Sequence, residues 1–326
     1  MMRRVLVCFL LCASAFGSSL SVFGQEVHAD RPDWFDGKPR TFVVNGYSTS
    51  FHWPAMLQRK LDRYFDGKRV IEVKSATQGS TPIAKWMNIE TGEPMQPWTT
   101  KLRPLLKDDS RPKIVLAQQS LQWAFGGRSE GIRDQSDQVH IRKGADVIKA
   151  YTDLLKADGA DAVVIAMHIY KQGMEPEIGN ERLSLAAFIQ SKPHDVFAGP
   201  DVWTPTSKIW PQAFQADKVH PNDMGAEVMA HHWFAALLTI CGKDIPPWSA
   251  DEMKQAMANL PALATRDGRP QRGEGRGMAA RMLRHDANKD GKITKTEFRG
   301  PTPMFSRFDK NNDGVIDNQE LTSSAR

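Results

Sequence analysis

The chain has 326 residues, enough for about two domains, of which 40% are hydrophobic and 25% are charged. These fractions are ordinary for globular proteins and exclude a mainly disordered, collagenous or coiled-coil chain. Its 43 Lys and Arg residues outnumber its 38 Asp and Glu residues by five. This excess is too small to indicate a nucleic-acid-binding protein, so we expect a folded chain with no nucleic-acid partner.

The N-terminus has the layout of a secretory signal peptide. Two arginines precede a hydrophobic run at 5–16, which is too short for a transmembrane helix of about 20 residues. Small or apolar residues near Gly24 suit a signal peptidase, so we expect cleavage after this residue. The mature chain is then secreted, periplasmic or attached at the cell surface, without a transmembrane segment.

Only one cysteine, Cys241, remains beyond this leader, so no intrachain disulfide can form in the mature chain. It lies at the end of an apolar helical pattern, which favours a buried and inert thiol over a reactive one. We therefore expect the stability of the chain to come from a hydrophobic core and from bound metal.

The region from Thr41 to about Ile240 alternates short β-branched runs with helical patterns, which predicts a parallel α/β sheet. Continuous apolar runs in this region suit strands that are buried on both faces. The stretch 171–208 has no clear period. The expected strands are 41–45, 69–73, 113–117 and 161–167, and the expected helices have faces at Leu57, Leu61 and Tyr64, at Ile141, Ala145, Ile148, Thr152 and Leu155, and from about Asp223 to Leu238.

The composition changes abruptly beyond the last of these helices. One more helix is expected at 250–260, and the segment 266–276 has five arginines and no apolar residue. Such a segment cannot bury enough surface to offset its ordering entropy, so we expect a solvated, flexible basic linker. The expected divisions are a signal peptide at 1–24, an α/β domain at 25–248, a helix and linker at 249–276 and a C-terminal unit at 277–326.

Two twelve-residue segments of the C-terminal unit, 286–297 and 309–320, meet every ligand position of the EF-hand calcium loop. Calcium takes about seven oxygen ligands, and glycine supplies the sharp turn at the sixth position. The expected ligands are Asp286, Asn288, Asp290, the carbonyl of Lys292, Thr294 and Glu297 in the first loop, and Asp309, Asn311, Asp313, the carbonyl of Val315, Asp317 and Glu320 in the second.

The last 50 residues thus resemble EF-hand proteins. Two prolines after the first loop leave room for only a short helix, which favours a structural or surface-binding calcium unit over a sensor. Ile293 and Ile316 are expected to pair the loops through a short strand contact. The second loop should bind calcium more tightly, because Asp317 gives it a fourth carboxylate where the first loop has Thr294.

A serine and an Asp-x-x-His motif lie near opposite ends of the α/β region. Ser48 follows the first expected strand, at the edge where open α/β sheets bind ligands. Asp217 and His220 precede the last helix, and Pro221 keeps His220 outside it. An aspartate at this spacing can bond Nδ1–H and leave Nε2 as a base, which makes a serine hydroxyl nucleophilic.

These residues resemble the SGNH hydrolases, the GDSL esterase and lipase superfamily, over about 41–238. Gly46-Tyr47-Ser48 stands at the family's Gly-Asp-Ser, Gly79 at its oxyanion glycine and Asp217-x-x-His220 at its closing motif. The resemblance implies a flavodoxin-like three-layer α/β fold with a parallel sheet and a small α-helical EF-hand unit attached. It also implies Ser48 as nucleophile, His220 as general base, Asp217 as its orienting acid, and the N–H groups of Ser48 and Gly79 in the oxyanion hole.

The sequence departs from the family at two places. Tyr47 replaces the aspartate before the nucleophile. The family's Gly-x-Asn-Asp block, whose asparagine donates to the oxyanion, is replaced by the sequence at 116–120, Leu-Ala-Gln-Gln-Ser. We expect the amide of Gln119 to take the role of that asparagine, or that of Gln118 if the alignment shifts by one residue.

The sequence therefore predicts a secreted serine esterase that acts on a small-molecule or polysaccharide ester, with O-acetyl groups on carbohydrate as a plausible substrate. Two calcium ions are the only expected cofactors, and none serves the ester chemistry. Trp86, Trp98 and Trp123 are the tryptophans expected near a pocket, while most others should pack in the core.

Two other functions remain open. One is a non-catalytic, calcium-dependent surface binding protein on a decayed hydrolase scaffold, which predicts that Ser48 and His220 lie too far apart to hydrogen-bond. The other is an enzyme whose EF-hands gate the active site, which the flexible linker disfavours. The sequence does not specify an oligomeric state.

Overall fold

The computed structural model describes residues 31–127, 130–248, 285–286, 288, 290–298, 305, 308–311, 313–317 and 320. The chain divides into two compact units, Met1–Asn259 and Leu260–Arg326. The expected signal peptide, the helix at 250–260 and the linker at 266–276 lie outside the described residues.

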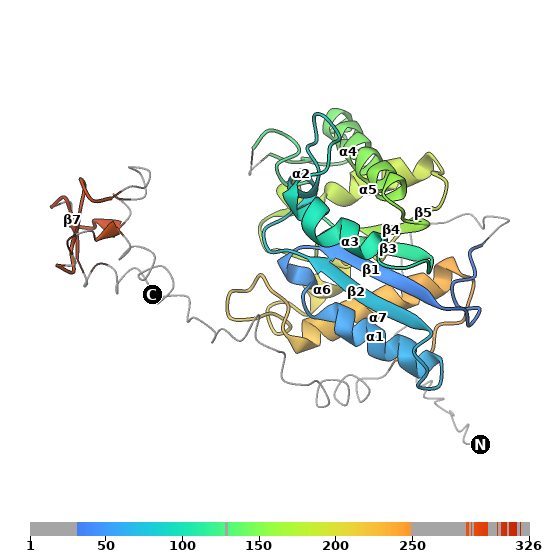
Figure 1. Cartoon of the computed structure of the whole chain (residues 1–326). Helices are drawn as coiled ribbons and strands as arrows, with labels where there is room; N and C mark the ends of the chain where they lie inside the picture. The colour runs from blue at the N-terminus through green and yellow to red at the C-terminus, as the bar shows by residue number, and fades with distance from the viewer. Residues whose placement is uncertain are drawn as a thin grey trace, which may run out of the picture. The chain divides into compact units, whose positions relative to one another are not determined.

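The first unit is built on a five-stranded parallel sheet with the order β2-β1-β3-β4-β5 (Figure 1). This order confirms the predicted flavodoxin-like α/β class. It also puts a topological switch point between β1 and β3, where ligands of such sheets bind at the carboxyl edge. The strands are β1 (Arg40–Gly46), β2 (Ile71–Thr77), β3 (Lys113–Gln118), β4 (Ala162–Ala166) and β5 (Val196–Ala198).

Two strand predictions differ from the structure. The second strand was expected at 69–73 but begins at Ile71 and continues to Thr77. β2 lies at the edge of the sheet, and polar residues interrupt its apolar pattern. The continuous apolar run by which central strands are recognised is therefore absent from β2. β5 was missed because it has only three residues and lies in the stretch without a period.

Helices cover both faces of the sheet to form three layers (Figure 1). On one face α1 (Trp53–Tyr64) packs beside α7 (Asp223–Ile240), and on the other α4 (Gln138–Ala157) packs beside α5 (Glu181–Gln190). In the described part of the chain, no helix has the length and apolar character needed to cross a membrane. The shorter helical segments are η1 (Ser48–Ser50), α2 (Ile83–Trp86), η2 (Trp98–Leu102), α3 (Arg103–Leu106), η3 (Glu175–Gly179) and α6 (Trp203–Lys208).

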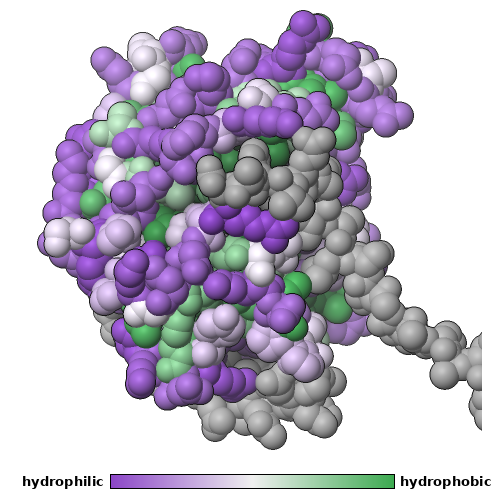
Figure 2. Space-filling view, turned by 90° about the vertical axis from the view of Figure 1, so that its right-hand side faces the viewer, coloured by the Kyte–Doolittle hydropathy of each residue, from purple (hydrophilic) through white to green (hydrophobic). Residues whose placement is uncertain are grey.

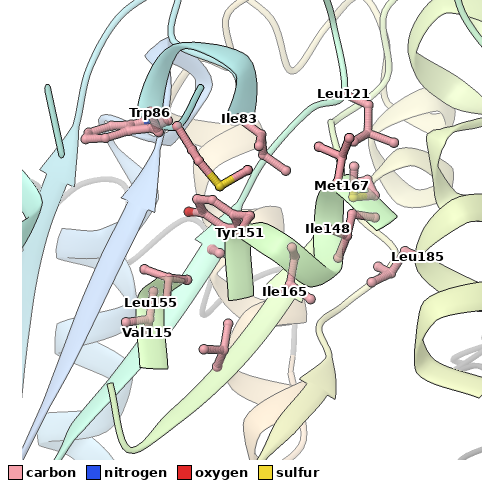
Figure 3. Packing of buried hydrophobic residues seen from close by; sticks show 14 of the residues in the cluster. Ile83, Trp86, Val115, Leu121, Ile148, Tyr151, Leu155, Ile165, Met167 and Leu185 are labelled. Atoms are coloured by element: carbon pink, nitrogen blue, oxygen red, sulfur yellow. The ribbon is translucent and has the colours of Figure 1, made fainter. Parts of the chain in front are cut away.

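The core between the sheet and α4 and α5 draws side chains from both (Figure 3). Val115 and Ile165 come from the strands and Ile148 from α4. Trp86 and Trp98 are completely buried here, so the expectation that they lie near a pocket is wrong for these two. Both indoles belong to this buried cluster, and Trp98 packs edge to face against Tyr151 of α4.

Figure 2 shows one face of the molecule, on which hydrophilic side chains predominate and hydrophobic ones are scattered.

Cys241 follows α7 and is buried, as the sequence predicted. Burial raises the pKa of its thiol to about 11, so the thiol stays protonated near neutral pH.

The described part of the second unit contains β6 (Ile293–Thr294) and β7 (Val315–Ile316), which pair antiparallel. Ile293 lies opposite Ile316, which confirms the predicted strand contact between the loops. These two side chains and two phenylalanines, Phe305 and Phe308, form a small buried cluster.

Candidate active site

Ser48 lies in a tight turn directly after β1. It is the first residue of η1, and the N–H of Ser50 donates to the carbonyl of Tyr47 at 2.8 Å. The turn needs glycine at position 46, because a Cβ there would lie 2.5 Å from the Oγ of Ser50 and 3.1 Å from the carbonyl of Gln118. Ser48 itself is partly exposed, at the carboxyl edge of the sheet.

Tyr47, which replaces the family's aspartate, is buried and packs on His168 with 4.8 Å between ring centroids. His168 follows β4 and donates from Nδ1 to the carbonyl of Ile169 at 2.6 Å. Burial lowers the pKa of His168 to about 3, against the opposing effect of that hydrogen bond. A neutral His168 therefore supports the nucleophile turn through Tyr47. Sequence reasoning missed it, although its place just beyond a strand's carboxyl end was a usable signal.

Asp217 fixes the loop that carries His220. Its Oδ1 accepts hydrogen bonds from the N–H groups of Val219 at 2.9 Å and His220 at 3.0 Å. Its Oδ2 lies 2.5 Å from Nδ1 of His220. Partial burial raises the pKa of Asp217, but these hydrogen bonds outweigh it and hold the pKa below its ordinary value. The carboxylate thus stays ionised beside Nδ1–H.

The loop continues directly into α7. Asn222 caps this helix, and its side-chain oxygen accepts from the N–H of Gly225 at 3.2 Å. The carbonyl of His220 accepts from the N–H of Gln215 at 2.8 Å, which closes the loop on its other side. His220 is therefore held by hydrogen bonds on its backbone as well as on its ring.

The structure brings Ser48 and His220 together although 172 residues separate them. Nε2 of His220 lies 2.8 Å from Oγ of Ser48. Because Nδ1–H donates to Asp217, Nε2 is left to accept the serine proton. An unbroken hydrogen-bonded series runs from the carboxylate through the imidazole to the hydroxyl.

Gly79 also lies beside Ser48. A Cβ built on Gly79 would lie 4.0 Å from Cβ of Ser48 and 4.0 Å from the ring of Phe51. The carbonyl of Gly79 accepts from the hydroxyl of Thr81 at 2.9 Å, which fixes the segment after β2.

The amide of Gln119 is turned into the core and not toward Ser48, contrary to the expectation from the sequence that it donates to an oxyanion there. It is fully buried, and its Nε2 donates to Oδ1 of Asn45 at 2.7 Å and to the hydroxyl of Tyr151 at 3.3 Å. Both amide hydrogens are therefore used between β1 and α4. The extra methylene of glutamine, relative to asparagine, lets the amide extend into this core network.

Gln118, the alternative, is also buried on the other side of the sheet. Its Oε1 accepts from Nε1 of Trp233 at 3.3 Å, and its Nε2 lies 3.5 Å from the hydroxyl of Thr49. Both glutamine amides are thus engaged in hydrogen bonds inside the fold.

His52 belongs to the surroundings of the same site. It precedes α1, and burial is the main cause that lowers its pKa. The carboxylate of Asp223 opposes this effect, while the charge of His220 adds to it. Within the described residues, Nδ1 of His52 is buried without a hydrogen-bond partner.

The described parts of the C-terminal loops have the backbone turn that the motif requires. Gly291 and Gly314 have φ of +82° and +84°, and their N–H groups donate to the carboxylates of Asp286 at 2.9 Å and Asp309 at 3.1 Å. Oδ1 of Asp309 is buried without a partner in the described chain, which suits a cation ligand.

The loop carboxylates also accept hydrogen bonds within their own loops. Glu320 accepts from the N–H of Lys310 at 2.8 Å, and Glu297 accepts from the N–H of Thr294 at 3.0 Å. Across the described residues, no three His, Cys, Asp or Glu side chains stand at metal-binding distance from one another.

Comparison with known proteins agrees with the division of the chain. The family model described as EF hand matches residues 285–300 and 303–323. No curated protein matches the chain.

Solved structures similar to this chain include an acetyl xylan esterase from Geobacillus stearothermophilus, at 11% identity and a TM-score of 0.42, covering 65% of this chain and 99% of that one. A variant of an acetyl-xylooligosaccharide esterase from Geobacillus has 12% identity, a TM-score of 0.44 and the same coverage. TesA has 15% identity and a TM-score of 0.40, and covers 62% of this chain and 99% of that one. The fold itself follows from the strand order β2-β1-β3-β4-β5. The chain thus joins a flavodoxin-like α/β unit to a C-terminal segment similar to EF hands.

Proposed function

We propose that the first unit is a serine esterase in which Ser48, His220 and Asp217 form the catalytic triad. The observation that carries this proposal is the 2.8 Å contact between Nε2 of His220 and Oγ of Ser48, with Asp217 on the opposite ring nitrogen. This spacing lies within the range needed for direct proton transfer.

The reaction proceeds by acyl transfer. Oγ of Ser48 attacks the ester carbonyl carbon while Nε2 of His220 takes the hydroxyl proton. His220 then gives this proton to the departing alcohol, which leaves an acyl group on Ser48. A water molecule, deprotonated by His220, attacks the acyl carbonyl and releases the acid, and Ser48 regains its proton. Asp217 keeps the imidazole in the required tautomer and stabilises its protonated form.

The oxyanion formed at each attack would be held by the backbone N–H groups of Ser48 and Gly79. The position of Gly79 beside Ser48 supports this assignment. Removing one such donor from an oxyanion hole costs about 2.7–4 kcal/mol of transition-state stabilisation. The Gln119 amide is left out of the hole because its hydrogens bond Asn45 and Tyr151.

The expected leader, together with the resemblance to esterases, favours an extracytoplasmic ester as substrate, either a small molecule or a polysaccharide carrying O-acetyl groups. The EF-hand segment would bind calcium in two loops, with the ligands expected from the sequence. Oxygen ligands from carboxylates, amides and carbonyls suit this hard cation. When bound, calcium would stabilise the C-terminal unit and take no part in the ester chemistry.

The rival function, a non-catalytic binding protein on a decayed scaffold, requires Ser48 and His220 to be separated. Their hydrogen bond counts against it. We therefore favour the enzyme, with calcium in a structural or attachment role.

Hydrolysis of a short-chain aryl acetate by the mature full-length protein tests this function. The wild type, Ser48→Ala and the matched control Ser191→Ala are compared, with calcium and with a chelator. We expect turnover in the wild type and in the control, its loss in Ser48→Ala, and no effect of the chelator. Equal background rates in all three proteins would contradict the esterase. Loss of turnover with the chelator would instead favour gating by the EF-hands.

A further inference from the structure

Trp123 is the one tryptophan among the exposed large hydrophobic residues of the described chain, with 43% of its surface accessible. It lies in the loop that follows β3, at the same carboxyl edge of the sheet as Ser48. Large aromatic side chains gain stability by burial, so an indole held in solvent at this edge requires another explanation.

The backbone conformation of Trp123 is a second unfavourable feature of this residue. The residue has φ of +73°, in a turn where the N–H of Ala124 donates to the carbonyl of Leu121 at 2.9 Å. Glycine or asparagine suits a positive φ at this place in a turn, whereas bulky residues rarely adopt it. Strain of this kind persists where the surroundings impose it, and it concentrates at ligand clamps.

Buried hydrogen bonds hold this turn in place. The hydroxyl of Ser120 donates to the fully buried Glu181 at 2.8 Å and accepts from the N–H of Gln122 at 3.0 Å. The carbonyl of Ser120 accepts from the N–H of Ile83, the first residue of α2, at 3.1 Å. The turn and α2 are thus one fixed element, and their geometry does not depend on a flexible loop.

α2 brings a cation to the exposed indole. Nζ of Lys85 lies over one face of the Trp123 ring in a cation–π contact, 5.8 Å from the ring centroid, and Lys85 is exposed. In the described part of the chain, no carboxylate pairs with this ammonium group. α2 begins four residues after Gly79, which adjoins Ser48. An exposed indole and an ammonium group without a carboxylate partner among the described residues therefore stand together, on segments that follow β3 and Gly79.

We propose that Trp123 and Lys85 form a subsite for a sugar ring that bears a carboxylate, in the polysaccharide whose ester Ser48 cleaves. This proposal rests on the proposed esterase function. The indole offers a flat apolar face to the C–H groups of a pyranose ring, and the ammonium group pairs with the carboxylate. A neutral sugar would use the indole but leave the charge unsatisfied, so the pair favours a uronic acid unit.

Binding, measured separately from turnover, tests the subsite. Calorimetric titration of the full-length wild type with de-esterified trigalacturonate and with neutral xylotriose gives the two dissociation constants. Trp123→Gly is expected to raise the Kd for trigalacturonate at least about tenfold. Its thermal midpoint should stay equal or rise, because glycine adopts the positive φ without strain. Lys85→Gln should raise the Kd for trigalacturonate and leave that for xylotriose unchanged, and the exposed Val139→Ala is the control.

Each contrary result overturns the subsite. The subsite is disproved if the wild type does not bind trigalacturonate, or if its Kd values for the two sugars are equal. It is also disproved if the Kd for trigalacturonate is unchanged in Trp123→Gly. Hydrolysis of aryl acetate by the control Val139→Ala should equal that of the wild type, because this exposed side chain lies outside the proposed subsite. If aryl acetate is not hydrolysed at all, the esterase fails while the binding titrations still decide the subsite.

Discussion

The amide of Gln119 shows how one methylene group redirects a side chain. Its Nε2 bonds Asn45 and Tyr151, while its Oε1 is buried without a partner among the described residues. The residue type suggested an oxyanion donor, but the direction of the side chain depends on the register of β1 and β3, which sets Asn45 opposite Ala117. The sequence around Gln119 does not specify this pairing register.

Replacing Gln119 distinguishes a hydrogen-bonding role in the core from a role as oxyanion donor. Gln119→Ala should lower the free energy of unfolding by about 1–3 kcal/mol, because buried partners lose their hydrogen bonds. It should lower kcat on aryl acetate by less than about tenfold, whereas loss of an oxyanion donor costs two to three decades. Chemical denaturation and steady-state kinetics measure both, with the exposed Gln135→Ala as control. A large fall in kcat without a change in stability would return Gln119 to the oxyanion hole.

His168 gives the stability of the fold a pH dependence. Burial holds its folded pKa at about 3, whereas an unfolded histidine has a pKa of about 6.5. As the pH falls through this window the unfolded chain takes up a proton that the folded chain does not. The free energy of unfolding should therefore decrease, by up to about 1.4 kcal/mol per pH unit from this group.

His168→Gln should flatten this dependence between pH 6.5 and 4.5, measured by denaturant unfolding. His231, whose pKa burial also lowers to about 3, should keep part of the slope in the variant. The control is the exposed Gln135→Ala, which removes no titratable group, and its slope should equal that of the wild type. Identical slopes in His168→Gln and wild type would show that His168 titrates normally in the fold.

At the scale of elements, most of the sheet and the candidate triad could be predicted. Asp217 and His220 sit in one short turn, so three residues of spacing specify their contact, and Ser48 follows a strongly apolar strand. The short β5 and the shifted β2 could not be predicted, because they depend on position at the edge of the sheet. The place of His168 beyond β4 was a signal in the sequence, but its contact with Tyr47 joins distant segments. The triad's catalytic role remains a prediction.

The contact between α4 and α5 depends on a glycine. A Cβ on Gly144 would lie 2.3 Å from Oγ of Ser184 and 2.8 Å from a methyl group of Leu121. Gly144→Ala should therefore separate the helices and lower the free energy of unfolding by about 1–3 kcal/mol, despite the higher helix propensity of alanine. Thermal or chemical unfolding measures this, with the exposed Lys149→Ala as control. An unchanged or higher stability would mean that the helices shift at no cost.

At the scale of the molecule, the two calcium loops should differ in affinity. The second loop has four carboxylates and the first has three, because Asp317 stands where the first loop has Thr294. Calorimetric titration should show a tighter site that is lost in Glu320→Gln and a weaker one lost in Glu297→Gln. Loss of the tighter site in Glu297→Gln instead would reverse this order.

In the described part of the second unit, Ile293, Phe305, Phe308 and Ile316 form a buried cluster against which Phe298 packs. Small units of this kind commonly obtain part of their folding free energy from a bound metal ion. We therefore expect calcium to act on this unit as a folding partner, so that the concentration of the ion around the protein decides whether the unit is ordered. The C-terminal unit would be unfolded where calcium is scarce and become ordered on reaching a calcium-rich environment, while the α/β unit folds without it.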